Sequence, residues 1–473
     1  MFQGACYILL FLVCLFVLAE VRSRGMRQPV LLVASLALYL TWAPWFAAVL
    51  FTSIVVNFGI GNWLRRNPHW PPLSAGITFN LGLLGVFKYL PEAAPHFSPI
   101  GGLANLALPL GISFWTFQAM SYLFDLYREE ELDPTFLEFA LYMVFFPVTI
   151  SGPVCRMPEM LPQFRSEEQT PWGDILRGLR RIATGVLMMQ LARLLGQGIL
   201  AGDGVVRGFD RAPHWSGPDV WCLAFGYGLQ LFFDFAGYTH IAVGAAQALG
   251  ITVPENFERP FTSTNPSVFW TRWHMSLSFW IRDYVFFPLA TARREVWWRN
   301  LALVISMAAF GLWHRASLLF LIWGCYHGVL LVGHRLWQQV VRRLNWEPPG
   351  RLGGVLGWLV TAIFISLGWV FFRANSLLQA RQMLSAIASP TSYASHLLSL
   401  SLYYLVACLA AGYAVTLVVG EALDRSPQSA TVALLARWRW VWIPSLYALA
   451  LLFAFMVTHG QEASAGQLMY RRF

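Results

Sequence analysis

The chain has 473 residues, of which 57% are hydrophobic and only 12% are charged, and its mean hydropathy is +0.53. A soluble protein carries about a quarter charged residues, so this composition excludes a soluble globular protein. The formal net charge of +9 comes from basic residues in short loops, which indicates cytoplasmic loops of a membrane protein. A basic surface for acidic partners is the alternative, and we expect no nucleic-acid partner.

A membrane-spanning helix needs roughly 20 apolar residues, and the sequence offers about eleven or twelve candidates. They lie near residues 2–21, 30–62, 74–90, 103–124, 136–155, 175–200, 218–250, 268–290, 300–334, 355–373, 400–420 and 438–458. We therefore predict an all-α integral membrane protein. We expect one polytopic domain over residues 1–473, with some of its membrane segments short or re-entrant.

The first apolar run, residues 2–21, has no basic stretch before it and no small-x-small cleavage site. We interpret it as a first membrane helix rather than a signal peptide. Basic residues cluster at 22–27, 65–66, 177–181, 292–299 and 342–351, and these loops are predicted to be cytoplasmic. Residues 90–99 contain no Lys or Arg, so we place them on the opposite side.

Two stretches mix charged, aromatic and apolar residues, at 156–181 and 254–288. Such a composition is too polar for a plain spanning helix. It is typical of segments at the membrane interface or along a cavity.

The apolar run 300–334 holds 35 residues, whereas two crossings need roughly 40. If the basic loops on either side are both cytoplasmic, the chain turns back within the membrane or uses short helices. The stretch GLWHRAS (311–317) lies near the expected turn and places His314 beside Arg315. Ionisable residues at such depth are costly and indicate function by default.

Four histidines lie in or beside apolar runs: His240, His274, His314 and His327. A neutral imidazole can take a proton from a hydroxyl, and His314 next to Trp313 suits a general base. The alternative for each is a histidine that packs between helices and bonds to a carbonyl. His327 and His334 share one helical face, but this spacing favours packing over metal ligation, so we predict no metal site.

Three acidic residues lie within or beside apolar runs: Asp125, Asp234 and Asp283. We expect them to pair with arginine or to orient a histidine rather than to ionise freely. Arg282 and Asp283 could equally form an interfacial anchor. The six cysteines have no paired spacing, so we expect buried packing residues rather than a disulfide framework or a zinc site.

Seven stretches together resemble the membrane-bound O-acyltransferase family. They are MVFFPVTISGPVCRMPEMLPQF (143–164), LFFDFAGYTHIAVGAAQALGI (231–251), PENFERPF (254–261), FWTRWHMSLSFWIRDYVFFPL (269–289), GLWHRAS (311–317), YHG (326–328) and FFRANSLLQA (371–380). The resemblance keeps the same order over residues 75–380. Within the family, the chain most resembles the bacterial branch that holds the alginate O-acetylation membrane subunit and the D-alanyl transfer protein of teichoic acid.

The resemblance implies a multi-helix bundle around a funnel through the bilayer. His314 would be the general base deep in this funnel, and His274 would lie at its donor end. The residues implied along the substrate and acyl-donor channel are Trp273, Trp280, Arg282, Asp283, Tyr284, Trp313 and Arg315. The family implies no bound cofactor, and acetyl-CoA would be the acyl thioester donor.

The same resemblance implies a cellular location for the protein and an acceptor for the acyl group. The protein would lie in the bacterial cytoplasmic (inner) membrane and serve O-acetylation of an exported polysaccharide, directly or through a periplasmic acetyltransferase partner. D-alanyl or another small-acyl transfer is the alternative. A non-catalytic transporter is a further one, although the inverted repeats common in transporters are not visible. Arg315 stands where the family usually has glycine, and His240 where the alginate branch has an acid.

Overall fold

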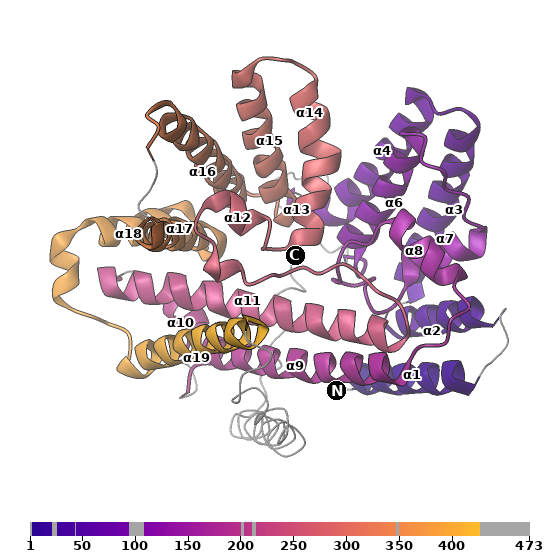
Figure 1. Ribbon diagram of the computed structural model, residues 1–473, viewed down its shortest axis with the longest axis horizontal. Coiled ribbons are helices and arrows are strands. Elements are labelled where there is room, and N and C mark those ends of the chain that lie inside the picture. Colours follow the sequence, from indigo (N-terminus) through magenta and orange to yellow (C-terminus); the bar gives the residue numbers. More distant parts are fainter. Residues whose placement is uncertain are drawn as a thin grey trace. The chain divides into compact units, whose positions relative to one another are not determined.

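The computed structural model describes residues 2–20, 26–42, 44–93, 108–199, 203–210, 214–346 and 350–425. These residues are mostly helical (Figure 1), and an isolated β-bridge joins Phe257 and Trp273. The predicted all-α class is confirmed. The predicted segment 438–458 lies outside the described residues, as do 22–25, 94–99 and 347–349 of three predicted loops.

The chain forms two compact units, each assembled from segments that are distant in sequence. The first unit comprises Met1–Ile182, Thr239–Asn256 and His274–Arg299, and the second comprises Ala183–Tyr238, Phe257–Trp273 and Asn300–Phe473. The chain passes between them within α9 (Trp172–Gln197), α11 (Gly217–Ala248) and α15 (Val296–His314). The single domain over residues 1–473 stays a prediction.

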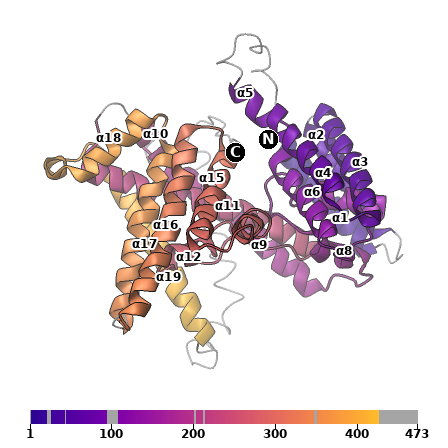
Figure 2. The same cartoon turned by 90° about the horizontal axis from the view of Figure 1, so that it is seen from above.

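The first unit combines helices from the first third of the chain, drawn in indigo and purple in Figures 1 and 2, with shorter helices from residues 274–299. Its elements are α1 (Phe2–Glu20), α2 (Arg27–Trp42), α3 (Pro44–Arg66), α4 (Trp70–Leu84), the π-helix η1 (Gly85–Tyr89), α5 (Leu90–Ala93), α6 (Ile112–Tyr127), α7 (Phe136–Val144), α8 (Met157–Arg165), α13 (Met275–Ile281), the π-helix η5 (Arg282–Phe286) and α14 (Phe287–Thr291). Pro44 begins α3, so the predicted run 30–62 is two helices.

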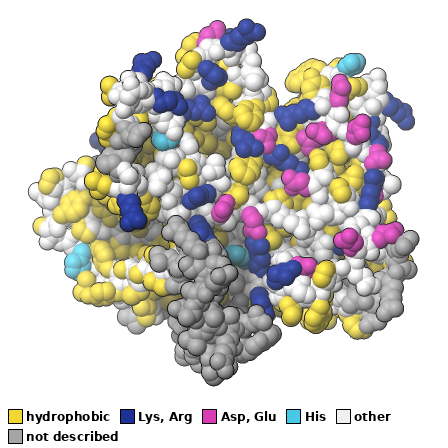
Figure 3. All heavy atoms as spheres, in the orientation of Figure 1, with side chains coloured by type: hydrophobic (Ala, Val, Ile, Leu, Met, Phe, Trp, Pro, Cys, Tyr) yellow, Lys and Arg dark blue, Asp and Glu magenta, His cyan; other side chains and the backbone are white. Residues whose placement is uncertain are grey.

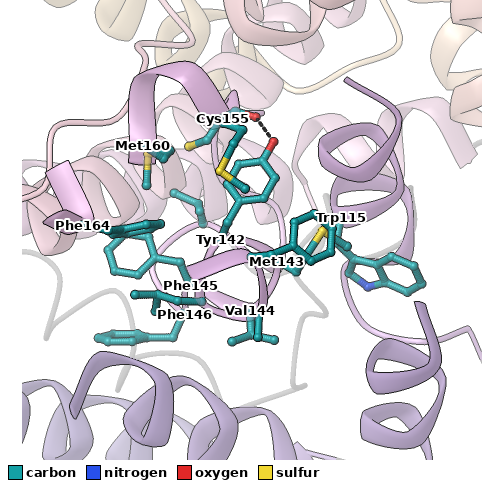
Figure 4. Packing of buried hydrophobic residues seen from close by; sticks show 14 of the residues in the cluster. Trp115, Tyr142, Met143, Val144, Phe145, Phe146, Cys155, Met160 and Phe164 are labelled. Carbon is teal, nitrogen blue, oxygen red and sulfur yellow. Dashed lines mark hydrogen bonds between the residues drawn. The ribbon is translucent and has the colours of Figure 1, made fainter. Parts of the chain in front are cut away.

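The core of the first unit surrounds the end of α7 (Figure 4). A capping box starts this helix, because Thr135 Oγ1 accepts from the Glu138 amide and the Glu138 carboxylate accepts from the Thr135 amide. The helix ends at Val144, because Phe145 has a non-helical ψ of 104°. Pro147 has no amide hydrogen to donate to the Met143 carbonyl, so the helical bonding could not continue past this point. The prediction of a spanning segment over 136–155 is therefore wrong. Tyr142 instead anchors the following loop by donating to the Cys155 carbonyl at 2.9 Å.

The second unit holds longer helices. Besides its parts of α9, α11 and α15, its elements are α10 (Val205–Asp210), the 3-10 helix η4 (Pro260–Thr262), α12 (Pro266–Trp270), α16 (Leu318–Arg343), α17 (Gly350–Arg373), α18 (Leu377–Ala388), the 3-10 helix η6 (Pro390–Ala394) and α19 (Leu400–Arg425). Two sequence motifs each end in a serine that caps the next helix. Ser317 of GLWHRAS accepts from the Phe320 amide at the start of α16, and Ser376 of FFRANS accepts from the Gln379 amide at the start of α18.

Seven helices of the described residues are long and apolar enough to cross a membrane. They are Pro44–Arg66, Trp70–Glu92, Gly217–Ala248, Val296–His314, Leu318–Arg343, Gly350–Arg373 and Leu400–Leu417. Of the α11 window, 89% is buried within the protein, against 17–39% for the other six. Those six leave apolar side chains at the surface, where lipid would cover them, and Figure 3 shows many such side chains in yellow.

The apolar run 300–334 contains a helix–turn–helix, as predicted, but both of its helices are long enough to span. The α15 helix begins at Val296 and α16 continues to Arg343, so each reaches beyond the apolar run into a predicted basic loop. Basic and aromatic side chains at such ends extend toward the interface while the backbone stays helical. Counting only apolar residues therefore underestimated the lengths of the two helices, and no re-entrant segment is needed to explain the short apolar run.

Glycines bring α15 and α16 into close contact. A Cβ on Gly311 would lie 2.1 Å from the Phe320 carbonyl oxygen, and one on Gly324 would lie 2.2 Å from the Met307 carbonyl oxygen. Backbone atoms cannot move aside, so only glycine permits this approach. Gly324 and Gly328 are four residues apart on α16, and a Cβ on Gly328 would lie 2.8 Å from Val304 Cα.

We expect Gly324→Ala to destabilise the protein by about 1–3 kcal/mol, because the added methyl group forces two backbones apart. The measurement is thermal unfolding in detergent. Gly333→Ala on the same helix is the matched control, since its Cβ meets nothing within 4 Å and alanine favours a helix. Equal melting temperatures for the two variants would contradict this account of the crossing.

Candidate active site

His314 is the last residue of α15 and is buried in an aromatic enclosure within the second unit. Five rings lie around its imidazole, at centroid distances of 4.7 Å for Trp313, 5.1 Å for Phe310, 5.2 Å for Phe372, 5.5 Å for Trp323 and 6.1 Å for Phe320. They come from α15, α16 and α17. An imidazole held this way has few orientations available, as a proton-transferring group requires.

The turn after α15 separates His314 from its neighbour. The Arg315 amide donates to the Gly311 carbonyl at 3.3 Å, and the Ser317 amide donates to the Arg315 carbonyl at 2.8 Å. His314 is buried, whereas Arg315 is exposed. The two ionisable residues are thus adjacent in sequence but differ in environment, and Trp313 is buried with His314.

His327 lies on α16 in the same unit and is also buried. Its ring contacts Trp323 at 5.0 Å, Trp270 at 5.1 Å and Tyr326 at 5.3 Å between centroids. A Cβ on Gly368 of α17 would lie 2.6 Å from His327 Nε2, so the glycine leaves room for the imidazole. The contact of Trp323 with both His327 and His314 joins the two histidines through one indole.

His274 belongs to the first unit and sits in a polar network instead. It precedes α13 with φ of 44°, a left-handed conformation that is rare outside glycine. Its Nδ1 lies 3.3 Å from Asn256 Oδ1, an oxygen that also accepts from the Ser276 hydroxyl. Because an amide oxygen only accepts, this pairing puts the proton on Nδ1 and leaves Nε2 as an acceptor. Asn256 Nδ2 in turn donates to Thr239 Oγ1 at 3.2 Å.

Complete burial lowers the pKa of His274 to about 3, so the imidazole is neutral at physiological pH. Sequence reasoning did not single out Asn256, although it lies in the PENFERPF stretch. Its buried amide, paired with a histidine 18 residues further along the chain, becomes visible only when the two segments fold together.

Arginines and acidic residues surround Tyr284 in the first unit. The Tyr284 hydroxyl donates to Asp125 at 2.6 Å, and Arg156 donates to Asp283 at 2.7 Å. The guanidinium groups of Arg128 and Arg156 each lie 5.1 Å from the Tyr284 ring centroid. The predicted pairing of Asp283 with arginine is confirmed.

Asp283 receives two arginines, and the interfacial-anchor reading of the Arg282–Asp283 pair stays a prediction. Arg282 binds its Oδ1 at 2.7 Å and Arg156 binds its Oδ2. Partial burial acts to raise the pKa of the Asp283 carboxyl, but hydrogen bonds from these two guanidinium groups outweigh it and hold that pKa below its ordinary value. Arg156, which binds Asp283 from a segment 127 residues away in the sequence, was not predicted as a site residue.

The remaining predicted channel residues divide between the units. Trp280 is in the first unit, where its indole donates to the Phe117 carbonyl at 3.0 Å and its ring lies 5.2 Å from Tyr284. Trp273 is in the second unit, stacked on Phe269 at 5.5 Å and near Trp369 at 5.0 Å. His240 lies in the first unit and accepts a hydrogen bond from Arg181 Nε at 3.3 Å.

Comparison with known proteins decides the family. The sequence profile of MBOAT, the membrane-bound O-acyltransferase family, matches residues 38–378. The chain belongs to this family. It is a multi-pass membrane O-acyltransferase, as the motifs predicted.

Three relatives of this O-acyltransferase illustrate the range of the family. It is 32% identical over 398 residues to the peptidoglycan O-acetyltransferase of Helicobacter pylori, with 76% of this chain and 73% of that protein covered. It is 30% identical to the probable alginate O-acetylase AlgI of Pseudomonas aeruginosa, covering 82% and 75%. It is 32% identical over 312 residues to the teichoic acid D-alanyltransferase of Bacillus subtilis, covering 62% and 75%.

We expect Asp283→Asn to lower the stability of this acyltransferase at pH 7 by about 1.5–3 kcal/mol, because charge-assisted hydrogen bonds to two arginines are lost. The Asp283 pKa is depressed on folding, so its contribution is complete above the unfolded value of about 4 and fades as the pH falls through that value towards the folded one. Thermal unfolding of both proteins between pH 7 and pH 3 should therefore show their difference narrowing on the acid side.

Asp174→Asn is the control for that comparison, since Asp174 forms a more exposed ion pair with Arg177, and such pairs contribute about 0–1 kcal/mol. A pH-independent gap between wild type and Asp283→Asn would mean that the carboxylate charge is not what stabilises the π-helix η5.

Proposed function

We propose that this O-acyltransferase moves an acetyl group from cytoplasmic acetyl-CoA to a hydroxyl of an exported polysaccharide, directly or through an extracytoplasmic acetyltransferase partner. The names of the peptidoglycan and alginate relatives support acetyl transfer to glycans. Both alignments cover 76–82% of this chain, against 62% for the D-alanyltransferase. All three relatives are bacterial, which supports a place in the bacterial cytoplasmic membrane.

Helix lengths and loop charges support a position for His314 toward the outer side of the membrane. The loops at 292–299 and 342–351 are basic, so the start of α15 and the end of α16 face the cytoplasm. The 19 residues of α15 rise about 28 Å, close to the roughly 30 Å of a hydrocarbon core. His314 would then lie at the far ends of α15 and α16, where an acceptor from outside can reach it.

The observation that carries the proposal is this buried imidazole, oriented by rings from three helices. Neutral His314 would take the proton of the acceptor hydroxyl as its oxygen bonds to the thioester carbonyl carbon. When the tetrahedral intermediate collapses, the carbon–sulfur bond breaks. The imidazolium returns the proton to the leaving thiolate, so that an ester and a free thiol are the products.

His274 would serve the donor end of the reaction. Its neutral imidazole, paired through Nδ1 with Asn256, would line the path of the acyl donor. Arg128, Arg156 and Arg282 lie in the same unit and concentrate positive charge around Asp283 and Tyr284. Such a cluster would attract an anionic thioester.

D-alanyl transfer is the second candidate, supported by the 32% identity to the Bacillus subtilis protein. A non-catalytic transporter would need no proton acceptor at His314.

Arg315, exposed beside His314, would bind an anionic group on the incoming acceptor or narrow its path.

The test compares wild type with His314→Ala in producing cells at matched membrane abundance, with labelled acetyl groups followed into exported glycan. Loss of a general base lowers rate by about 10²–10⁴-fold, so we expect labelling to fall at least 100-fold. His69→Ala is the control, because His69 is exposed and its side chain forms no cap hydrogen bond. Undiminished labelling in His314→Ala would reject the base role, and labelling by D-alanine but not acetate would favour the second candidate.

A further inference from the structure

Three aromatic side chains with polar ring nitrogens meet beside His314 in the second unit. They are Trp270 of α12 and Trp323 and His327 of α16, with exposed fractions of 7%, 1% and 1%. Their ring centroids form a triangle with sides of 5.9, 5.1 and 5.0 Å. Trp323 also lies 5.5 Å from His314, so the triangle adjoins the proposed base.

Four ring nitrogens of this triangle have no hydrogen-bond partner among the described residues. They are Trp270 Nε1, Trp323 Nε1, and both Nδ1 and Nε2 of His327. Leaving one such group unpaired in a protein interior costs about 1–3 kcal/mol. By contrast, the indoles of Trp280 and Trp298 each donate to a backbone carbonyl.

Unpaired polar groups gathered at one membrane-embedded place indicate a polar guest rather than a packing role. An indole nitrogen can only donate, and a neutral imidazole donates once and accepts once. The triangle therefore offers three donors against one acceptor. A guest that matches it is an acceptor-rich group, of which a carbonyl oxygen that gains negative charge is the best fit.

We propose that Trp270, Trp323 and His327 bind the carbonyl oxygen of the acyl group and stabilise the charge that develops there during transfer. This rests on the proposed function, with His314 as base. As the acceptor oxygen bonds to the carbonyl carbon, the carbonyl π electrons move onto its oxygen, where the donors receive them. They return when the carbon–sulfur bond breaks and the thiolate leaves.

The experiment measures acyl transfer and thermal unfolding for Trp270→Phe, Trp323→Phe and His327→Leu in detergent-solubilised full-length protein. Each variant keeps an apolar side chain and removes the ring nitrogens. Loss of one oxyanion donor lowers turnover by about 10²–10³-fold where it has been measured, so we expect at least a 10-fold fall in kcat for each. The KM for acetyl-CoA should change little, because the charge arises only in the transition state.

Stability gives the second readout. Replacing an unpaired polar ring by an apolar one relieves its desolvation cost, so the three variants should unfold within a few degrees of wild type. Trp358→Phe is the matched control: its indole donates to the Phe261 carbonyl at 2.7 Å and lies at an exposed position. It should retain full transfer.

Two outcomes would overturn the proposal. Full transfer by the folded variants would mean that the ring nitrogens do not contact the reacting carbonyl. Unfolding of the variants would mean that these nitrogens stabilise the fold instead. His314→Ala in the same assay separates the two levels: if it is inactive while the triangle variants are active, only this inference fails, and if it is active, the proposed function itself fails.

Discussion

The crossing of α15 and α16 is the contact on which the candidate site depends. Gly311 and Gly324 let each helix approach the backbone of the other, and no hydrophobic driving force between helices is available in lipid, so such close packing must hold them together. It places Phe320 and Trp323 of one helix against His314 at the end of the other. Without the glycines the imidazole would lose the two α16 rings of the five that enclose it.

The two predicted catalytic histidines are positioned by different physical means. His314 is held by aromatic packing at a helix end, which restricts its orientation. His274 is held by a hydrogen bond from a left-handed backbone position, and Asn256 assigns its tautomer. Aromatic packing and a hydrogen bond thus fix the orientation of the two rings in different ways.

Polar groups within the protein follow two patterns. Most are paired, as in the Arg156–Asp283 and Tyr284–Asp125 contacts, because unpaired polar groups are expensive away from water. The triangle of Trp270, Trp323 and His327 is different, since its ring nitrogens have no partner among the described residues. Asp283 and Asp125 are thus paired within the first unit, while the triangle of unpaired ring nitrogens lies next to the proposed base in the second.

The sequence alone determined the membrane class, the helix–turn–helix at GLWHRAS and the family, because hydropathy and local motifs depend on neighbouring residues. Ser317 and Ser376 lie within motifs that the sequence showed, but their role as helix caps was not predicted. That role depends only on neighbouring residues. The short α7 was missed, since the apolar run 136–155 was counted as one segment although Pro147 has no amide donor with which to continue a helix. Only the tertiary structure decided that Asn256 pairs with His274, that Arg156 reaches Asp283 and that Trp270 meets His327. These contacts join residues on separate segments, and helix packing rather than sequence pattern brings them together.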